Sequence, residues 1–200
     1  CVLGLKFILK NLNLTRFMKR LIRILVLSFF VFSNPASSSE KLINSLKEGG
    51  KLIFIRHAYA PGNGDPENFN LKDCTSQRNL SQKGINQAKK IGLFFTENKI
   101  QIDKVLSSEW CRCKDTAQYA FNSFETLDAL NSFYDIKFAK NKTKQINDLK
   151  KYILDWSSKK NLVLVTHFVV ISEALNTGSS SGEIIVSDRN FNIISSIETN

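Results

Sequence analysis

The sequence is poor in the side chains that most often bind metals. Its 200 residues include two histidines and four cysteines, and Cys1 lies in an N-terminal segment that we expect to be removed. Cys111 and Cys113 form a Cys-x-Cys pair, but Arg112 lies between them and Arg56 precedes a histidine. Both guanidinium groups would repel a cation. We therefore expect no metal and no cofactor.

Acidic residues are absent from the first 38 positions, which carry six of the 28 basic residues. A basic start at Met18, an apolar stretch at 24–32 and an Ala-x-Ser pattern at 36–38 are typical of a secretory signal peptide cut after Ser38. The apolar stretch is too short for a membrane span, which needs about 20 residues. An uncleaved anchor is the alternative.

This interpretation sets the domain organisation. Residues 1–17 are a spurious upstream extension, residues 18–38 a signal peptide, and residues 39–200 one domain with enough chain to bury a core. We expect a periplasmic or secreted protein with no stable membrane span after processing.

The net charge of +10 is largely a property of the leader, which contributes six of these charges. The remaining lysine-rich runs favour a solvated face. No basic motif interleaved with aromatic residues is present, so we expect no nucleic-acid partner.

Apolar runs of strand length alternate with amphipathic segments along the predicted domain. Strands are expected at 51–56, 104–107 and 161–166, with a closing hairpin at 184–186 and 191–194. Helices are expected at 39–50, 81–95, 110–121, 143–156 and 169–176. The alternation predicts an α/β fold, a three-layer sandwich with a mainly parallel central sheet flanked by helices.

Both histidines directly follow predicted strands. His57 and His167 should meet at one edge of the sheet, because α/β folds expose reactive side chains at the carboxyl ends of parallel strands. Arg56 precedes His57, and Arg112 lies near the start of a helix, where backbone N–H groups add positive potential. Two imidazoles and two guanidiniums at one rim predict a pocket for a phosphoryl group, with a histidine as nucleophile.

Five short blocks occur in order along the chain. They are Arg56-His57-Ala58, residues 79–88, residues 107–117, residues 165–167 and residues 181–184. Together they resemble the motifs of the histidine phosphatase superfamily, which includes phosphoglycerate mutases, over roughly residues 51–186. The resemblance implies a phosphoglycerate mutase-like fold. It also implies a metal-independent phosphomonoesterase, a hydrolase of the histidine acid phosphatase type.

The resemblance assigns roles to individual residues. His57 is implied as the nucleophile that accepts the phosphoryl group, and Arg56, Arg112 and His167 as the lining of the pocket. Asn63 falls where related proteins often place an asparagine near the substrate, although a turn between two glycines explains it equally well.

Arg78 precedes a predicted helix, and we interpret it as a solvated residue rather than a substrate ligand.

The acid that protonates the leaving oxygen is the open role. One branch of the family places it directly after the second histidine, where this chain has Phe168. The other places a Glu after the helix with the second arginine, where residues 125–135 give no clean match. Asp135 has the better spacing, and Asp65 and Asp128 are alternatives.

Two other classes of function stay open. If no acid reaches the leaving group, the fold would serve as a non-catalytic phospho-ligand binding module. A metal-dependent hydrolase is the third class.

The expected substrate is a phosphorylated small molecule or a phosphorylated envelope sugar. Only 55 residues separate Arg112 from His167, which leaves no room for the large insertions that cover the site in phosphoglycerate mutases. The chain therefore resembles the small phosphohistidine phosphatases and the envelope sugar-phosphate phosphatases, and secretion favours the latter.

Cys74 lies in the loop after His57, and Cys111 and Cys113 flank Arg112. A disulfide from Cys74 to one of them would tie this loop to the arginine helix. Three free thiols are the alternative.

Overall fold

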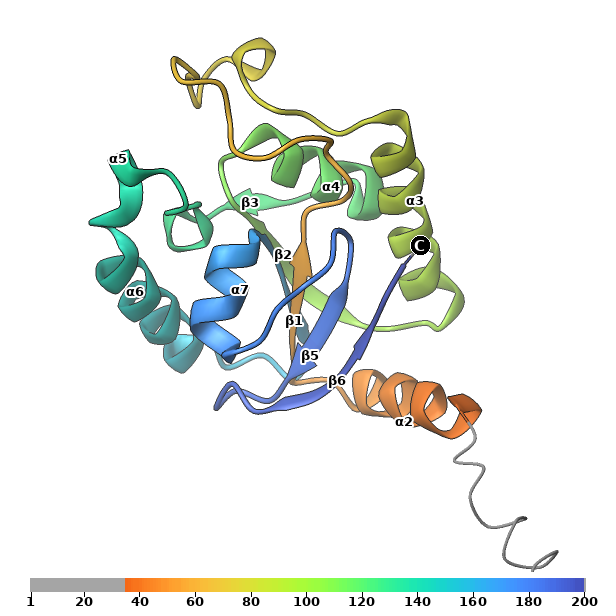
Figure 1. The fold of residues 1–200 in the computed structure, drawn as a ribbon. Helices are drawn as coiled ribbons and strands as arrows, with labels where there is room; N and C mark the ends of the chain where they lie inside the picture. The colour runs from red at the N-terminus through yellow and green to blue at the C-terminus, as the bar shows by residue number, and fades with distance from the viewer. Residues whose placement is uncertain (1–34, 200) are drawn as a thin grey trace, which may run out of the picture. The chain divides into compact units, whose positions relative to one another are not determined.

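The apolar runs form the centre of a six-stranded sheet in the computed structural model, which describes residues 35–199 (Figure 1). The strand order is β3-β2-β4-β1-β5-β6. The strands are β1 Leu52–Arg56, β2 Ile102–Ser107, β3 Glu125–Thr126, β4 Asn161–Thr166, β5 Ile184–Ser187 and β6 Ile193–Ile197. Strands β1 to β4 pair in parallel, whereas β5 and β6 pair antiparallel at one edge. The predicted α/β fold with a mainly parallel sheet is confirmed.

Helices cover both faces of the sheet (Figure 1). They are α2 Pro35–Glu48, α3 Gln82–Glu97, α4 Cys111–Phe121, α5 Ile136–Ala139, α6 Lys142–Asp155 and α7 Phe168–Leu175. Alternate residues of each strand point to opposite faces. Ile53 and Val163 pack in a core with α3 and α4, whereas Phe54 and Leu164 pack in a second core with α6 and α7.

Two predicted boundaries are wrong. The first helix begins at Pro35, so Ser39 does not cap it. The hairpin strand expected at 191–194 begins at Ile193, because Asp188 accepts hydrogen bonds from the backbone N–H groups of Asn190 and Asn192 and so lengthens the turn.

The sequence analysis did not predict strand β3, the short helix α5 or the single turns η1 Cys74–Ser76 and η2 Asp128–Leu130. All four are too short for a periodic pattern to indicate them.

The predicted upstream extension and most of the predicted signal peptide lie outside the described residues. Within 35–199, no helix combines the length and the apolar character that crossing a membrane requires.

The start of α3 fixes the loop that leaves β1. Ser81 caps this helix, as expected, by accepting a hydrogen bond from the N–H of Gly84. A Cβ at Gly84 would lie 2.1 Å from the carbonyl oxygen of Tyr59, so only glycine allows this approach. Gln87 accepts from the N–H of Tyr59 and donates to the carbonyl of Ser181. The block at 79–88 therefore holds two loops at the carboxyl edge of the sheet.

Candidate active site

His57 lies at the carboxyl end of β1, as the sequence predicts. Its backbone N–H donates to the carbonyl of Thr166 at the end of β4, over 2.9 Å. Its Nδ1 lies 2.9 Å from the carbonyl oxygen of Ala58. Because a carbonyl oxygen can only accept, this contact requires the proton on Nδ1. The lone pair of a neutral His57 is therefore on Nε2.

The charge state of His57 follows from its surroundings. Burial of the ring, and next the positive charge of Arg112, lower its pKa well below the usual value. The lowered pKa favours the neutral side chain, which is the state that a nucleophile needs.

His167 lies opposite, at the start of α7, with its ring centroid 5.5 Å from that of His57. Burial and the charge of Arg112 lower its pKa well below the usual value. Its Nε2 lies 2.8 Å from Oγ of Ser108, which in turn donates to Oδ1 of Asn131. With the hydroxyl proton of Ser108 directed at Asn131, Nε2 of His167 is the donor to Ser108.

Two arginines bring buried positive charge beside the imidazoles. Nη1 of Arg56 donates to the carbonyl of Ser179 over 2.6 Å, and Nη1 of Arg112 donates to Oδ1 of Asp65 over 2.8 Å. Among the described residues, nothing accepts a hydrogen bond from the buried Nε of Arg56 or of Arg112. Unpaired buried donors are costly, so the two guanidinium groups are held here at a cost in free energy.

Arg78 is half-buried beside these groups, so the interpretation of a solvated arginine is wrong. Its Nε donates to the carbonyl of Gly64 and its Nη1 to the carbonyl of Ala60. Burial, and next the positive charge of Arg112, lower the pKa of both Arg78 and Arg56. Arg78 lies in the loop between β1 and α3, so no periodic sequence pattern indicates where its side chain lies.

Asp65 lines the pocket and is tied to Arg112. Its side chain is 7% exposed, and Oδ1 accepts from the backbone N–H of Arg78 and from Arg112. Its Oδ2 accepts from Nε1 of Trp110 over 3.0 Å. Oδ1 therefore accepts from two donors and Oδ2 from one, and through these bonds the carboxylate holds Arg112 in place.

The other candidates are placed differently. Asp135 lines the pocket, and its Oδ1 caps α5 by accepting from the N–H of Lys137. Asp128 is exposed and outside the pocket lining, so the structure does not bring it to the site. Asn63 lines the pocket and also stands in a turn, between Gly62 at φ 89° and Gly64 at φ 63°.

One pocket of about 580 Å³ at the carboxyl edge of the sheet joins these groups. Its lining includes His57, His167, Arg56, Arg78, Arg112 and Asp135. Within the described part of the chain, no cluster of three or more His, Cys, Asp or Glu side chains suits a metal ion.

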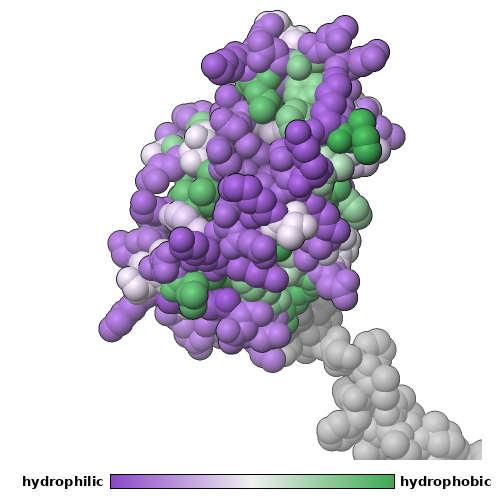
Figure 2. All heavy atoms as spheres, turned by 90° about the vertical axis from the view of Figure 1, so that its left-hand side faces the viewer, coloured by the Kyte–Doolittle hydropathy of each residue, from purple (hydrophilic) through white to green (hydrophobic). Residues whose placement is uncertain are grey.

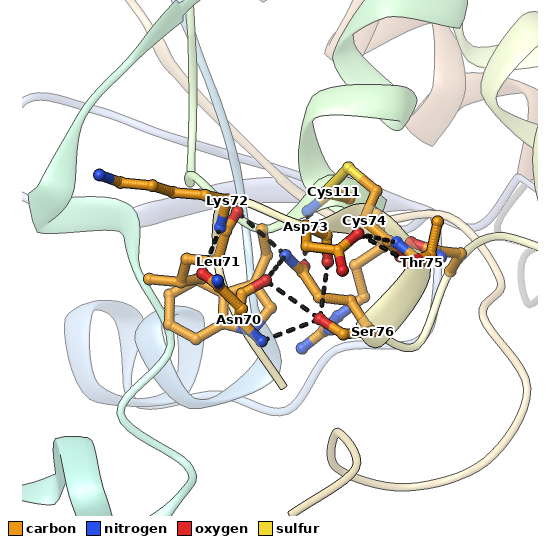
Figure 3. The surroundings of a disulfide bond; sticks show 12 residues. Asn70, Leu71, Lys72, Asp73, Cys74, Thr75, Ser76 and Cys111 are labelled. Atoms are coloured by element: carbon orange, nitrogen blue, oxygen red, sulfur yellow. Dashed lines mark hydrogen bonds between the residues drawn. A yellow bond between two sulfur atoms is a disulfide. The ribbon is translucent and has the colours of Figure 1, made fainter. Parts of the chain in front are cut away.

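The predicted disulfide is present between Cys74 and Cys111, whose Cα atoms are 5.6 Å apart. Figure 3 shows it beside a hydrogen-bonded turn at residues 70–76, where Ser76 accepts from the N–H of Asn70. The crosslink ties the loop that carries Asp65 to the first residue of α4.

Cys113 is free and buried, with its Sγ 3.5 Å from Nε2 of His167. Burial raises the pKa of its thiol to about 12, so it stays protonated.

The fold and this pocket define an α/β protein with a neutral buried histidine beside clustered guanidinium groups. The family model of the histidine phosphatase superfamily (branch 1) matches residues 52–161, more than half of the chain, and the chain belongs to this superfamily. The matched range contains Arg56, His57 and Arg112 and ends before His167, which the fold brings to the same pocket.

Solved structures share this fold over nearly their whole length. One is a putative phosphohistidine phosphatase SixA from Agrobacterium tumefaciens, with 19% identity and a TM-score of 0.52, covering 74% of this chain and 98% of that chain. A putative alpha-ribazole-5'-P phosphatase from Escherichia coli has 14% identity and a TM-score of 0.53, covering 72% and 94%. A phosphoglycerate mutase from Thermus thermophilus has 14% identity and a TM-score of 0.50, covering 75% and 99%.

No curated protein sequence matched the chain. Membership of the superfamily supports chemistry of the phosphatase or mutase type, whereas these solved structures show the shared fold.

The arrangement around Asp65 predicts a positioning role. We expect Asp65→Asn to lower kcat/KM for phosphomonoesters by about 10²-fold, because its amide N–H₂ would face donor groups and displace Arg112. Loss of the acid would lower kcat/KM most for substrates with poor leaving groups. Displacement of Arg112 should instead lower kcat/KM equally for aryl and alkyl phosphates. Steady-state kinetics with both substrates measure this.

Asp188→Asn is the matched control, because Asp188 also accepts backbone hydrogen bonds but lies outside the pocket lining. It should leave kcat/KM unchanged. Full activity of Asp65→Asn, or a loss confined to alkyl phosphates, would contradict the positioning role.

Proposed function

We propose that this protein is a metal-independent phosphomonoesterase that works through a phosphohistidine intermediate on His57. The observation that carries the proposal is the contact from Nδ1 to the carbonyl of Ala58, which leaves the lone pair on Nε2 inside the arginine-lined pocket. A histidine with that tautomer and a low pKa is ready to attack phosphorus.

The first step transfers the phosphoryl group to the protein. Arg56, Arg78 and Arg112 neutralise the charge on the equatorial oxygens, so no metal is needed. Nε2 of His57 forms a bond to phosphorus while the bond from phosphorus to the leaving oxygen breaks. The leaving oxygen takes a proton from the protein and departs as an alcohol.

The second step returns the protein to its starting state. A water molecule attacks phosphorus, the P–N bond breaks, and the proton of water passes to the carboxylate that acted before as the acid. The products are inorganic phosphate and neutral His57.

His167 stabilises the phosphoryl oxygens in both steps of this scheme. Its neutral form uses Nε2–H for Ser108, so it has no N–H left for an anion. A phosphate dianion in the pocket counteracts the positive arginines and favours a proton on Nδ1 of His167, which then serves as a donor.

Asp135 is the acid in this proposal. Asp65 and Asp135 are the carboxylates in the described pocket lining, and both oxygens of Asp65 already accept hydrogen bonds. The cap of α5 uses only Oδ1 of Asp135, so Oδ2 is the oxygen with capacity for a proton.

We also propose a periplasmic or secreted location and a substrate from the cell envelope, either a phosphorylated small molecule or a phosphorylated sugar. The basic and apolar pattern at 18–38 supports export. The disulfide between Cys74 and Cys111 supports an oxidising compartment, because such bonds are rare in reducing ones.

A non-catalytic module that binds phosphorylated ligands is the second candidate. It is favoured by the hydrogen bonds that occupy both oxygens of Asp65 and one oxygen of Asp135. The two candidates share the phosphate site and differ in turnover.

Phosphatase activity is the first prediction of this scheme. The protein should release phosphate from a chromogenic phosphomonoester in the presence of EDTA, and His57→Ala should abolish release. Rapid quenching with a ³²P-labelled substrate should trap a protein-bound label that is stable in alkali and labile in acid.

His167→Gln is the comparison variant, because it should turn over slowly yet still become labelled. Label in His57→Ala, or loss of activity with EDTA, would contradict the mechanism. Phosphate binding with neither label nor release would support the binding module instead.

The acid is tested by Asp135→Asn. We expect kcat/KM to fall by about 10²-fold for an alkyl phosphate and by much less for p-nitrophenyl phosphate, whose phenolate leaves without a proton. Asp128→Asn is the matched control and should not change either rate. Equal losses on both substrates would exclude Asp135 as the acid.

The disulfide predicts sensitivity to reduction. Cys74→Ser should lower the free energy of unfolding by about 2–4 kcal/mol and raise KM, because the loop that holds Asp65 and Arg78 loses its crosslink. Dithiothreitol should have the same effect on the wild type and none on the double variant Cys74→Ser, Cys111→Ser. Denaturant titrations and KM measure both effects, and a wild type indifferent to complete reduction would contradict this role.

A further inference from the structure

The phosphate-binding groups account for only part of the pocket. A volume of about 580 Å³ is in the range of pockets that hold drug-sized ligands, well beyond one phosphoryl group. The remaining space has to take the leaving group of a phosphomonoester. The side chains around that space therefore determine which leaving groups fit.

Three large apolar side chains line this pocket while remaining open to solvent. Tyr134 is 66% exposed, Ile136 is 86% exposed and Phe168 is 44% exposed. We call these three residues the apolar rim. Tyr134 and Ile136 belong to the segment at the start of α5, whereas Phe168 is the first residue of α7.

Exposed apolar residues are normally scattered singly over a soluble domain. Figure 2, which shows the left-hand side of Figure 1, has hydrophobic surface only as separate patches among hydrophilic groups. Three such residues around one pocket are therefore informative.

The apolar rim meets the phosphate-binding groups at one point. The guanidinium carbon of Arg56 lies 5.6 Å from the centre of the Phe168 ring. A leaving group that contacts Phe168 is therefore next to a guanidinium that binds the phosphoryl oxygens. Tyr134 lies close to Gly64 of the loop after β1, where an added Cβ would be 3.8 Å from Cε1 of the tyrosine ring.

We propose that this pocket selects phosphomonoesters whose leaving group is an apolar ring. The arginine side chains bind the phosphoryl group, and the apolar rim packs against the ring of the leaving group. The aromatic side chains of Tyr134 and Phe168 are suited to stacking on this ring. This inference rests on the proposed function for the reaction, and of the two proposed substrates it favours the phosphorylated small molecule over the phosphorylated sugar. It concerns binding and is tested without turnover.

The test uses non-hydrolysable phosphonates, so that the reactivity of aryl esters does not enter. Calorimetry gives Kd of the full-length protein for 2-naphthylmethylphosphonate, methylphosphonate and a phosphonate that carries a sugar. We expect the naphthyl compound to bind about tenfold more tightly than methylphosphonate, from the apolar area that its ring buries. The sugar compound should bind no more tightly than methylphosphonate.

Matched variants locate the effect. Ile136→Ser should reduce several-fold the ratio of the Kd for methylphosphonate to the Kd for the naphthyl compound. Leu154→Ser is the control and should leave this ratio unchanged, because Leu154 is similarly exposed, at 84%, but lies on α6 outside the pocket. Phe168→Ala should reduce the ratio in the same way. Its control is Tyr119→Ala, an aromatic residue 42% exposed on α4 outside the pocket.

The outcomes separate this inference from the proposed function. Equal Kd values for the three compounds, tighter binding of the sugar compound, or equal effects of Ile136→Ser and Leu154→Ser would overturn the apolar rim as a selector. The phosphatase would still stand if phosphate release depends on His57. If the protein prefers the naphthyl compound but releases no phosphate, the apolar rim is supported as a selector and the proposed phosphatase function is overturned.

Discussion

A single buried carboxylate holds the positive side of the pocket in place. Asp65 comes from the loop after β1, whereas Trp110 and Arg112, which donate to it, come from the start of α4. A buried ion pair is costly to break, because the remaining charge loses its partner in a medium of low dielectric constant. The position of Arg112, and with it the positive potential on both imidazoles, therefore depends on a loop residue. The disulfide between Cys74 and Cys111 joins the same two elements.

Without an anion, this cluster of like charges is unfavourable. The charge of Arg112 contributes to lowering the pKa of Arg56, Arg78, His57 and His167. Backbone carbonyls hold the guanidinium groups of Arg56 and Arg78 in place. The rest of the fold therefore has to offset the repulsion between these charges. Groups fixed in this way need no reorganisation when a phosphoryl group arrives, which is how preorganised sites accelerate charge transfer.

The sequence predicted the parts of this site that follow from regular structure. The buried strands fix His57 and His167 at one edge of the sheet, and α4 presents Arg112, so periodicity and motif spacing were sufficient for these residues. Arg78 and the clamp by Asp65 were missed because turns at positive φ, such as Gly62 and Gly64, set the path of the loop. The hydrogen bonds from Ser108 to His167 and to Asn131 join residues 59 and 23 positions apart, a pairing that no local pattern encodes.

The segment from Asn131 to Ile136, where the sequence offered no clean motif, carries the leaving-group side of the proposed chemistry. Asn131 orients Ser108 and through it His167, Asp135 is the proposed acid, and Tyr134 and Ile136 belong to the apolar rim. The phosphate side comes from β1, the loop after it, the start of α4 and His167 at the end of β4. Because residues 134–136 lie outside these elements, changes there can alter the preferred leaving group while the phosphoryl-binding groups stay in place. A small fold can in this way keep one reaction and change its substrate.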